Sequence, residues 1–248
     1  MKGPRIIIVE DEIIISDNLK NILEMKGYHV VDVVMTGEGA VKSAETQQPD
    51  CILMDILLKG EIDGITAASE IKSILDIPII YLTAYSDQVT MDRVKKTEPD
   101  GFLVKPFKRD DLYAAIDLAI YRKNMRHKTQ ESVKMYMHII NSAPDPIVIL
   151  QDNIFKYTNK PFFDLFGYSQ EDIDKGLSFY NLSEEKFRDE IKIRYESRMN
   201  EEMVSKTFRL NIIKKNGTVI SCETSASLIK YNGRNADLVI IRDISERS

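Results

Sequence analysis

Two adjacent acids, a third carboxylate, a hydroxyl and an ammonium group lie directly after apolar runs in the first half of this chain. These groups are Glu10, Asp11, Asp55, Thr83 and Lys105, and the runs before them are 6–9, 51–54, 79–82 and 102–104. Continuous apolar runs of this length, separated by helical segments, are typical of parallel strands that are buried on both faces. Ligands of such sheets bind beyond the carboxyl ends of the strands, so we expect the five side chains to converge there.

The chemistry of such a cluster follows from its charges. Three neighbouring carboxylates repel one another unless a cation or a proton offsets their charge. Glu10, Asp11 and Asp55 offer oxygen ligands, too few to enclose Ca²⁺ but suited to Mg²⁺, which keeps waters and accepts phosphate oxygens. A carboxylate can also attack phosphorus and form an aspartyl phosphate. Phosphoryl transfer depends mainly on positioning and charge neutralisation, so Thr83 and Lys105 beside the ion would complete the site.

Alternating strands and helices position these groups. The expected strands are near 5–9, 29–34, 50–54, 78–82 and 101–104, and the expected helices are near 12–26, 37–47, 64–75, 87–96 and from about 109 onward. Short connections with right-handed crossovers predict a flavodoxin-like α/β fold, which is a doubly wound parallel sheet of five strands.

The helix that begins near residue 109 continues beyond the length that a compact domain needs. Neither Gly nor Pro interrupts it before Pro144, while Lys123, Arg126 and Gln130 interrupt its apolar stripe. It is therefore an imperfect coiled-coil candidate. We favour a long connecting helix, with a linker at 124–142 that supports a homodimer, over a terminal helix followed by a disordered linker.

Short strands and turns follow Pro144. We expect a hairpin of 145–150 and 154–157, an N-cap at Asn159 before a short aromatic helix, and a capping box from Ser169 to Asp172. Three longer strands are expected near 203–214, 218–230 and 236–243. Together they predict an α+β domain whose antiparallel sheet is covered on one side by small helices.

Composition limits the class of protein. Apolar residues make up 43% and charged residues 29%, and no apolar stretch approaches the roughly 18 residues that a membrane span requires. The N-terminus lacks a signal-peptide profile, so we expect a cytoplasmic protein without membrane contact. Cys51 and Cys222 are interpreted as core residues. The basic cluster at 122–128 is interpreted as a solvated helix face rather than a DNA or membrane site, since the net charge is −5.

Residues 1–123 resemble a response-regulator receiver domain of two-component signalling. The matching motifs are Val9–Glu12, Leu53–Ile56, Leu82–Ala84 and Val104–Phe107, in the family's order and spacing. The resemblance implies that Asp55 accepts a phosphoryl group from a histidine kinase. The further roles that it implies are Mg²⁺ ligation by Glu10, Asp11, Asp55 and the Leu57 carbonyl, phosphoryl contact by Lys105, a moving hydroxyl at Thr83, a switch aromatic at Phe102 and a cis Lys105–Pro106 bond.

The sequence departs from the family in the loop 57–64. Lys59 stands where many receivers have proline, and the loop is interpreted as one residue longer. Positions that contact the attacking water in this family hold Leu57 and Tyr85, which orient water poorly, so we expect slow self-dephosphorylation. A degenerate receiver that folds without being phosphorylated is the alternative.

Residues 143–248 resemble a PAS domain, through the segments 149–152, 157–163, 165–169, 215–217 and 241–247. Five apolar residues suit either a packed core, which we favour, or a ligand cavity: Ile147, Phe155, Phe162, Phe163 and Phe166. All three histidines precede the domain, which argues against haem, and the strand position of Cys222 argues against a flavin adduct. The PAS ligand is therefore left open.

The function that the resemblance implies is a response regulator of a phosphorelay, in which the long helix relays phosphorylation of Asp55 to the PAS domain. The alternative is an N-terminal receiver-PAS part of a larger histidine kinase or other effector. A hydrolase with an aspartyl-phosphate intermediate would need a second acid where Leu57 stands, so we expect no enzyme. No helix-turn-helix pattern supports direct nucleic-acid binding.

Overall fold

The computed structural model describes residues 3–84 and 88–245. The chain divides into two compact units, Met1–Glu131 and Ser132–Ser248, and each is described by itself. Among the described residues, none of the helices combines the length and the apolar character that a membrane span requires.

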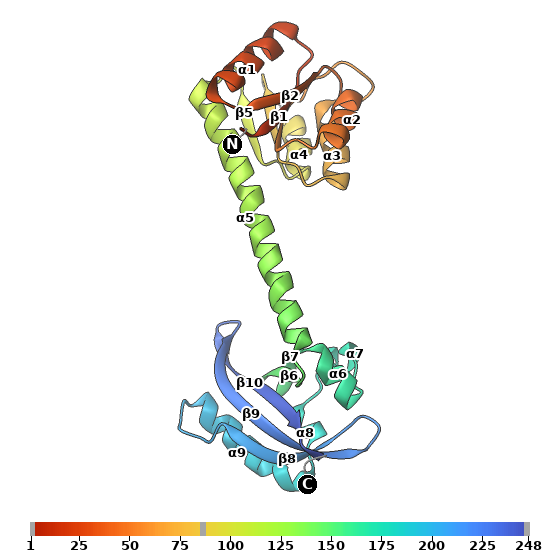
Figure 1. Cartoon of the computed structure of the whole chain (residues 1–248), viewed down its shortest axis with the longest axis vertical. Coiled ribbons are helices and arrows are strands. Elements are labelled where there is room, and N and C mark those ends of the chain that lie inside the picture. The colour runs from red at the N-terminus through yellow and green to blue at the C-terminus, as the bar shows by residue number, and fades with distance from the viewer. Residues whose placement is uncertain (1–2, 85–87, 246–248) are drawn as a thin grey trace. The chain divides into compact units, whose positions relative to one another are not determined.

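The first unit is built on a sheet with helices around it (Figure 1). The sheet is parallel, with the strand order β2-β1-β3-β4-β5. Its strands are β1 (Arg5–Val9), β2 (His29–Val34), β3 (Cys51–Asp55), β4 (Ile79–Thr83) and β5 (Gly101–Val104). Its helices are α1 (Ile13–Lys26), α2 (Gly37–Gln47), α3 (Gly64–Ile74), α4 (Gln88–Lys96) and the first part of α5 (Arg109–Ser142). The predicted doubly wound sheet is confirmed.

Two apolar clusters bury the two faces of this sheet. Ile8 packs with residues of α1 and α5 on one face, while Ile7 packs with residues of α2, α3 and α4 on the other. Successive side chains of a strand point to opposite faces, so a continuous apolar run supplies both clusters. Asp55 and Thr83 are the last residues of β3 and β4, so each strand ends one residue later than we expected.

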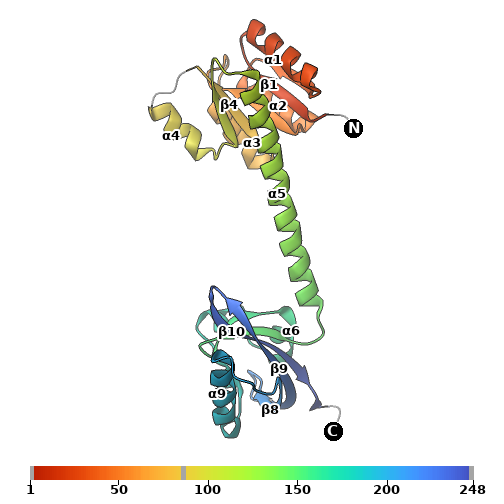
Figure 2. The same cartoon turned by 90° about the vertical axis from the view of Figure 1, so that its left-hand side faces the viewer.

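The second unit is an antiparallel sheet with the order β7-β6-β10-β9-β8, and α9 lies along it (Figure 2). Its strands are β6 (Ile147–Gln151), β7 (Ile154–Thr158), β8 (Thr207–Ile213), β9 (Val219–Tyr231) and β10 (Arg234–Asp243). Its helices after α5 are α6 (Lys160–Phe166), α7 (Gln170–Asp174), α8 (Phe179–Leu182) and α9 (Glu185–Met199). The expected α+β domain is confirmed, with a capping box at Ser169 and Asp172.

Two expectations for this unit were wrong in detail. The strand expected near 203–214 begins only at Thr207, and the 15-residue α9 is longer than the small helices that we expected. Only Ile191 of α9 is buried, so the helix carries almost no apolar periodicity from which it could be predicted. Cys222 is buried, as is Cys51 in the first unit, and both thiols are free.

Asn159 occupies the N-cap position of α6, but its side chain does not cap that helix. Its Oδ1 accepts a hydrogen bond from the backbone N–H of Ile147 at 2.8 Å. Its Nδ2 donates to the carbonyl oxygens of Ile140 at 2.9 Å and Asp145 at 3.2 Å. The side chain is fully buried, so it uses its hydrogen bonds to join the end of α5 to the start of β6.

Candidate functional site

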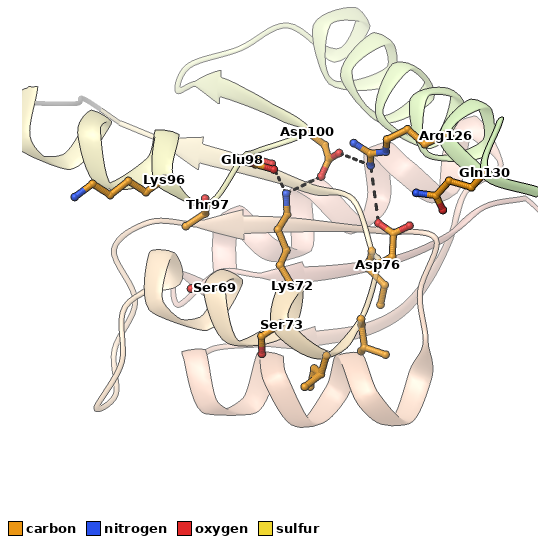
Figure 3. Close-up of a pocket in the computed structure, with 13 residues that line it drawn as sticks. Ser69, Lys72, Ser73, Asp76, Lys96, Thr97, Glu98, Asp100, Arg126 and Gln130 are labelled. Atoms are coloured by element: carbon orange, nitrogen blue, oxygen red, sulfur yellow. Dashed lines mark hydrogen bonds and ion pairs between the residues drawn. The ribbon is translucent and has the colours of Figure 1, made fainter. Parts of the chain in front are cut away.

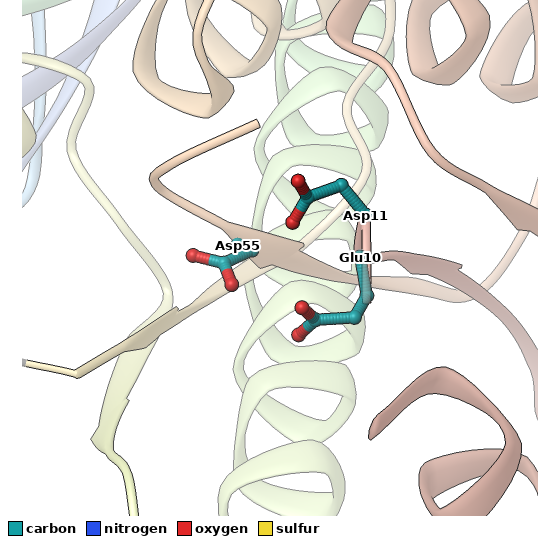
Figure 4. A group of neighbouring side chains, drawn as sticks. All are labelled: Glu10, Asp11 and Asp55. Atoms are coloured by element: carbon teal, nitrogen blue, oxygen red, sulfur yellow. The ribbon is translucent and has the colours of Figure 1, made fainter. Parts of the chain in front are cut away.

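Three carboxylates meet at the carboxyl ends of β1 and β3. Glu10, Asp11 and Asp55 each offer an oxygen within 4.8 Å of the others (Figure 4). Glu10 is fully buried and Asp55 is 8% exposed, whereas Asp11 is more accessible. The convergence predicted from the strand ends is therefore observed for all three acids.

Backbone hydrogen bonds hold the acids at this edge of the sheet. The N–H of Glu10 donates to the carbonyl of Val34 at 3.0 Å, which extends the pairing of β1 with β2. Beyond Asp55, the N–H of Ile56 donates to the carbonyl of Leu82, and the N–H of Gly64 donates to the carbonyl of Ile56. Both carboxylates are therefore fixed by the sheet and by the start of α3.

Gly64 permits a close backbone contact beneath Asp55. A Cβ at position 64 would lie 1.9 Å from the Asp55 carbonyl oxygen. Because this oxygen belongs to the backbone, Gly64→Ala should destabilise the first unit by about 2 kcal/mol or more in urea unfolding. Gly101→Ala is the matched control, since its Cβ would meet only Ile80 side-chain atoms at 3.5 Å or more. Equal stability losses in the two variants would contradict this account.

Lys105 supplies the ammonium group of the cluster. Its Nζ lies 2.5 Å from Glu10 Oε2 and 2.6 Å from Asp55 Oδ2. Burial lowers the pKa of Lys105, but the hydrogen bonds with Asp55 and Glu10 raise it by more than burial lowers it. The pKa of Lys105 therefore lies above its usual value. Burial raises the pKa of Glu10, and the hydrogen bond from Lys105 opposes that rise. Lys105 thus stays charged and bridges the two acids.

Thr83 and the β5 residues complete this edge. Thr83 is buried, and its carbonyl accepts a hydrogen bond from the N–H of Lys105 at 2.6 Å. The Lys105–Pro106 peptide bond is cis, as the resemblance implied. Phe102 is 54% exposed, so its ring lies outward in this structure.

The loop after Asp55 contributes two further groups. The N–H of Leu57 donates to Asp55 Oδ1 at 3.1 Å, while the Leu57 side chain is exposed. The Lys59 ammonium lies 3.2 Å from Asp11 Oδ2. The sequence does not predict this ion pair, although the unusual lysine is visible in the loop. Tyr85, the other position relevant to self-dephosphorylation, lies outside the described residues.

The donor set fits a hard divalent ion. Carboxylate oxygens from three residues face one small region, and carboxylates are the protein ligands that Mg²⁺ prefers. Three carboxylates would leave other positions around such an ion to water or a phosphoryl oxygen. Glu10, Asp11 and Asp55 would hold the ion, with Lys105 beside them.

A second polar cluster lies at the opposite edge of the sheet, in a pocket of about 670 Å³ between α3, α4 and α5 (Figure 3). The buried Asp100 carboxylate accepts a hydrogen bond from the Ile79 N–H and pairs with Lys72 at 3.1 Å and Arg126 at 3.1 Å. His127 contacts Asp76 at 3.0 Å. Two members of the basic cluster at 122–128, Arg126 and His127, therefore pair with acids of the first unit. Both side chains stay about half exposed, which agrees with the expected solvated helix face.

The second unit has a small, partly open cavity of about 30 Å³ between α9 and the sheet. None of the five apolar residues that were candidates for lining a cavity contributes to it, and Phe155, Phe162 and Phe166 are buried in the core. Arg198 and Asp237 line it and form a bidentate ion pair with N–O distances of 2.7–2.9 Å. A space this small suits about one water molecule.

Comparison with known proteins supports both halves of this description. The family model of the response regulator receiver domain matches residues 6–117, and that of the PAS fold matches residues 134–244. The transcriptional regulatory protein PdtaR of Mycobacterium tuberculosis is 41% identical over 118 residues, which are 48% of this chain and 57% of that protein. The uncharacterized transcriptional regulatory protein YbdJ of Bacillus subtilis is 39% identical over 108 residues, which are 43% of this chain and 46% of that protein. The chain thus spans about half the length of the curated relatives that it matches.

Among solved structures, the signal receiver domain of a modulated diguanylate cyclase from Desulfovibrio desulfuricans G20 is 37% identical, with a TM-score of 0.49 and coverage of 50% of this chain and 98% of that one. The receiver domain of sensor histidine kinase PA1611 from Pseudomonas aeruginosa PAO1, solved with a magnesium ion in its active-site cleft, is 36% identical, with a TM-score of 0.44 and coverage of 48% and 98%. On the family matches, this chain belongs to the response-regulator receiver family through residues 6–117 and continues into a PAS domain at residues 134–244.

Proposed function

We propose that this chain is a response regulator that accepts a phosphoryl group on Asp55 from a histidine kinase and relays the change through α5 to the PAS domain. The observation that carries the proposal is the convergence of three carboxylates and the Lys105 ammonium at one edge of a receiver sheet. Its cofactor would be Mg²⁺, which the related PA1611 receiver holds in its active-site cleft. The protein would act as a phosphoacceptor in the cytoplasm, and not as a turnover enzyme.

The side chains would divide the work of phosphoryl capture. A bound Mg²⁺ would neutralise charge on the carboxylates and on the incoming phosphoryl group. Lys105 Nζ lies 2.6 Å from Asp55 Oδ2, so Lys105 would move to a phosphoryl oxygen before the reaction. Asp55 Oδ2 would then attack phosphorus, and the P–N bond to the histidine of the kinase would break with the imidazole as leaving group. Thr83, at the end of the neighbouring strand, would offer its hydroxyl to another phosphoryl oxygen.

Helix α5 supports the proposed relay and homodimer. It runs without interruption from Arg109 to Ser142. Apolar side chains along it are 43–65% exposed: Tyr121, Met125, Val133, Met135, Tyr136, Met137 and Ile139. A helix surface of this kind suits pairing with the same helix of a second copy, although its apolar stripe is not a strict heptad repeat.

The test is phosphorylation of the whole chain by acetyl phosphate, followed by intact-mass spectrometry. Wild-type protein should gain one phosphoryl group when Mg²⁺ is present and none when it is chelated. Asp55→Asn should abolish the gain, because an amide lacks the nucleophilic carboxylate oxygen. Asp50→Asn, an exposed aspartate near the start of β3, is the matched control and should be phosphorylated like the wild type. Phosphorylation of the Asp55→Asn variant to the wild-type extent would overturn the proposal.

A further inference from the structure

Two ammonium groups divide the three carboxylates of the acidic site. Lys105 lies within 2.6 Å of Glu10 and Asp55, and Lys59 lies 3.2 Å from Asp11. Each acid therefore has a cationic neighbour from the protein itself. The second cation comes from the loop in which this sequence departs from the usual receiver pattern.

The backbone around Lys59 is held in place on both sides. The backbone of Lys59 forms an isolated parallel β-bridge with that of Thr36, the residue before α2. On the other side of Lys59, Glu38 Oε1 accepts hydrogen bonds from the N–H groups of Glu61 at 2.6 Å and Ile62 at 3.0 Å. The Lys59 side chain is 78% exposed, but these contacts fix the point from which it extends toward Asp11.

Gly60 makes this loop conformation possible. Its φ is +126°, a region that L side chains rarely adopt, and a Cβ there would lie 2.7 Å from a carboxylate oxygen of Glu38. The same carboxylate accepts the hydrogen bonds of the Glu61 and Ile62 N–H groups. These bonds, and before them the bond from its own backbone N–H, hold the pKa of Glu38 below its usual value. The sequence Lys59-Gly60 therefore places a lysine next to the metal ligands in a defined way.

We propose that the Lys59 ammonium pairs with the Asp11 carboxylate in the metal-free site and must move away from it when Mg²⁺ binds. This inference rests on the proposed function and adds a regulator of metal affinity to it. Asp11 is the most accessible of the three acids, so it is the acid that an arriving ion meets with least obstruction. An ammonium group at 3.2 Å both competes for that carboxylate and repels a divalent cation. Lys59 consequently lowers the Mg²⁺ affinity of this receiver.

The test is a titration of the whole chain with MgCl₂, followed by amide chemical shifts at constant ionic strength. Lys59→Met keeps the length of the side chain and removes its charge, and it should tighten Mg²⁺ binding about three- to tenfold, as expected for one partly screened charge. Lys59→Arg should stay near the wild-type affinity. Lys96→Met is the charge-matched control, because Lys96 is exposed at the C-terminal end of α4, at the opposite edge of the sheet.

The outcomes separate this inference from the proposed function. Tighter binding in Lys59→Met alone, with a difference that shrinks as KCl is raised, supports it, since salt screens exposed charges. Equal affinities in Lys59→Met and Lys96→Met, or weaker binding in Lys59→Met, overturn it while leaving Asp55 phosphorylation intact. A wild-type chain that binds no Mg²⁺ and gains no phosphoryl group overturns both.

Discussion

Replacing Lys105 by methionine should destabilise the metal-free receiver unit by about 3 kcal/mol, the size expected when one partner is removed from a largely buried ion pair. Lys105 is 18% exposed in its side chain and bridges Glu10, which is fully buried, to Asp55. Without it, three carboxylates lie within 4.8 Å of one another, and Lys59 is the one cation that pairs with any of them among residues 3–84 and 88–245. Urea unfolding of the whole chain in the presence of chelator would measure the loss of stability. Hydrogen exchange of the β1 and β3 amides would assign that loss to the receiver unit.

Added Mg²⁺ should restore much of this stability, because the ion binds the folded acidic site and supplies the missing positive charge. Lys95→Met is the control: Lys95 forms an exposed pair with Asp92 on α4, and its removal should change stability little in either condition. A Lys105→Met variant as stable as Lys95→Met in chelator would show that the carboxylates do not depend on the lysine. Failure of Mg²⁺ to stabilise Lys105→Met would argue against ion binding at these acids.

Replacing Arg198 by methionine should destabilise the PAS unit by about 3–5 kcal/mol at neutral pH. The Asp237 side chain is 1% exposed and that of Arg198 14% exposed, and the guanidinium makes three hydrogen bonds to the carboxylate. The variant leaves a buried carboxylate without its counterion. Calorimetry of the whole chain, with hydrogen exchange in β10 to assign the transition, would detect the change.

The same variant should gain stability as the pH falls. Burial already raises the pKa of Asp237, and Arg198 opposes the rise, so removing Arg198 raises this pKa further. A group with a raised pKa in the folded state binds a proton more readily there than when unfolded, so the stability it contributes is lost as pH rises through that pKa. Arg198→Met should therefore be more stable near about pH 5.5 than near about pH 7.5, relative to wild type.

Arg242→Met is the matched control for this pair. Arg242 also bonds a carboxylate of the PAS unit, that of Asp145, but its side chain is 57% exposed. Solvent can replace that interaction, so the loss of stability should be much smaller and nearly independent of pH. Similar losses in the two Arg variants would mean that burial does not determine the strength of the Arg198 pair.

The acidic site could be predicted from sequence because its information is local. Each of Glu10, Asp55, Thr83 and Lys105 ends or follows an apolar run, and parallel strands bring such ends together. The bounds of the five receiver strands were accurate to within one residue for the same reason, since buried strands are continuous apolar runs. Asn159 was placed correctly at the start of α6, but its side-chain partners depend on where α5 ends, which propensity does not encode.

The contacts that sequence could not supply join residues far apart in the chain. Lys59 meets Asp11 across 48 positions, and Arg198 meets Asp237 across 39. Nothing in the composition of either segment selects its partner, because charged residues are common throughout the chain. Helix α9 was missed in its length because its buried face is reduced to Ile191. Long-range polar pairing and weakly amphipathic helices are thus the features for which the fold itself is needed.

The buried amide of Asn159 has a consequence for the proposed relay through α5. It binds the carbonyls of Ile140 and Asp145 and the N–H of Ile147 at once, and no solvent reaches it. A small rotation of the C-terminal end of α5 would break these hydrogen bonds and leave buried polar groups without partners, which costs free energy. The end of α5 and the start of β6 should therefore either move together or lose all three hydrogen bonds at once. Rotation of α5 would then change the structure of this junction in a stepwise rather than a graded manner.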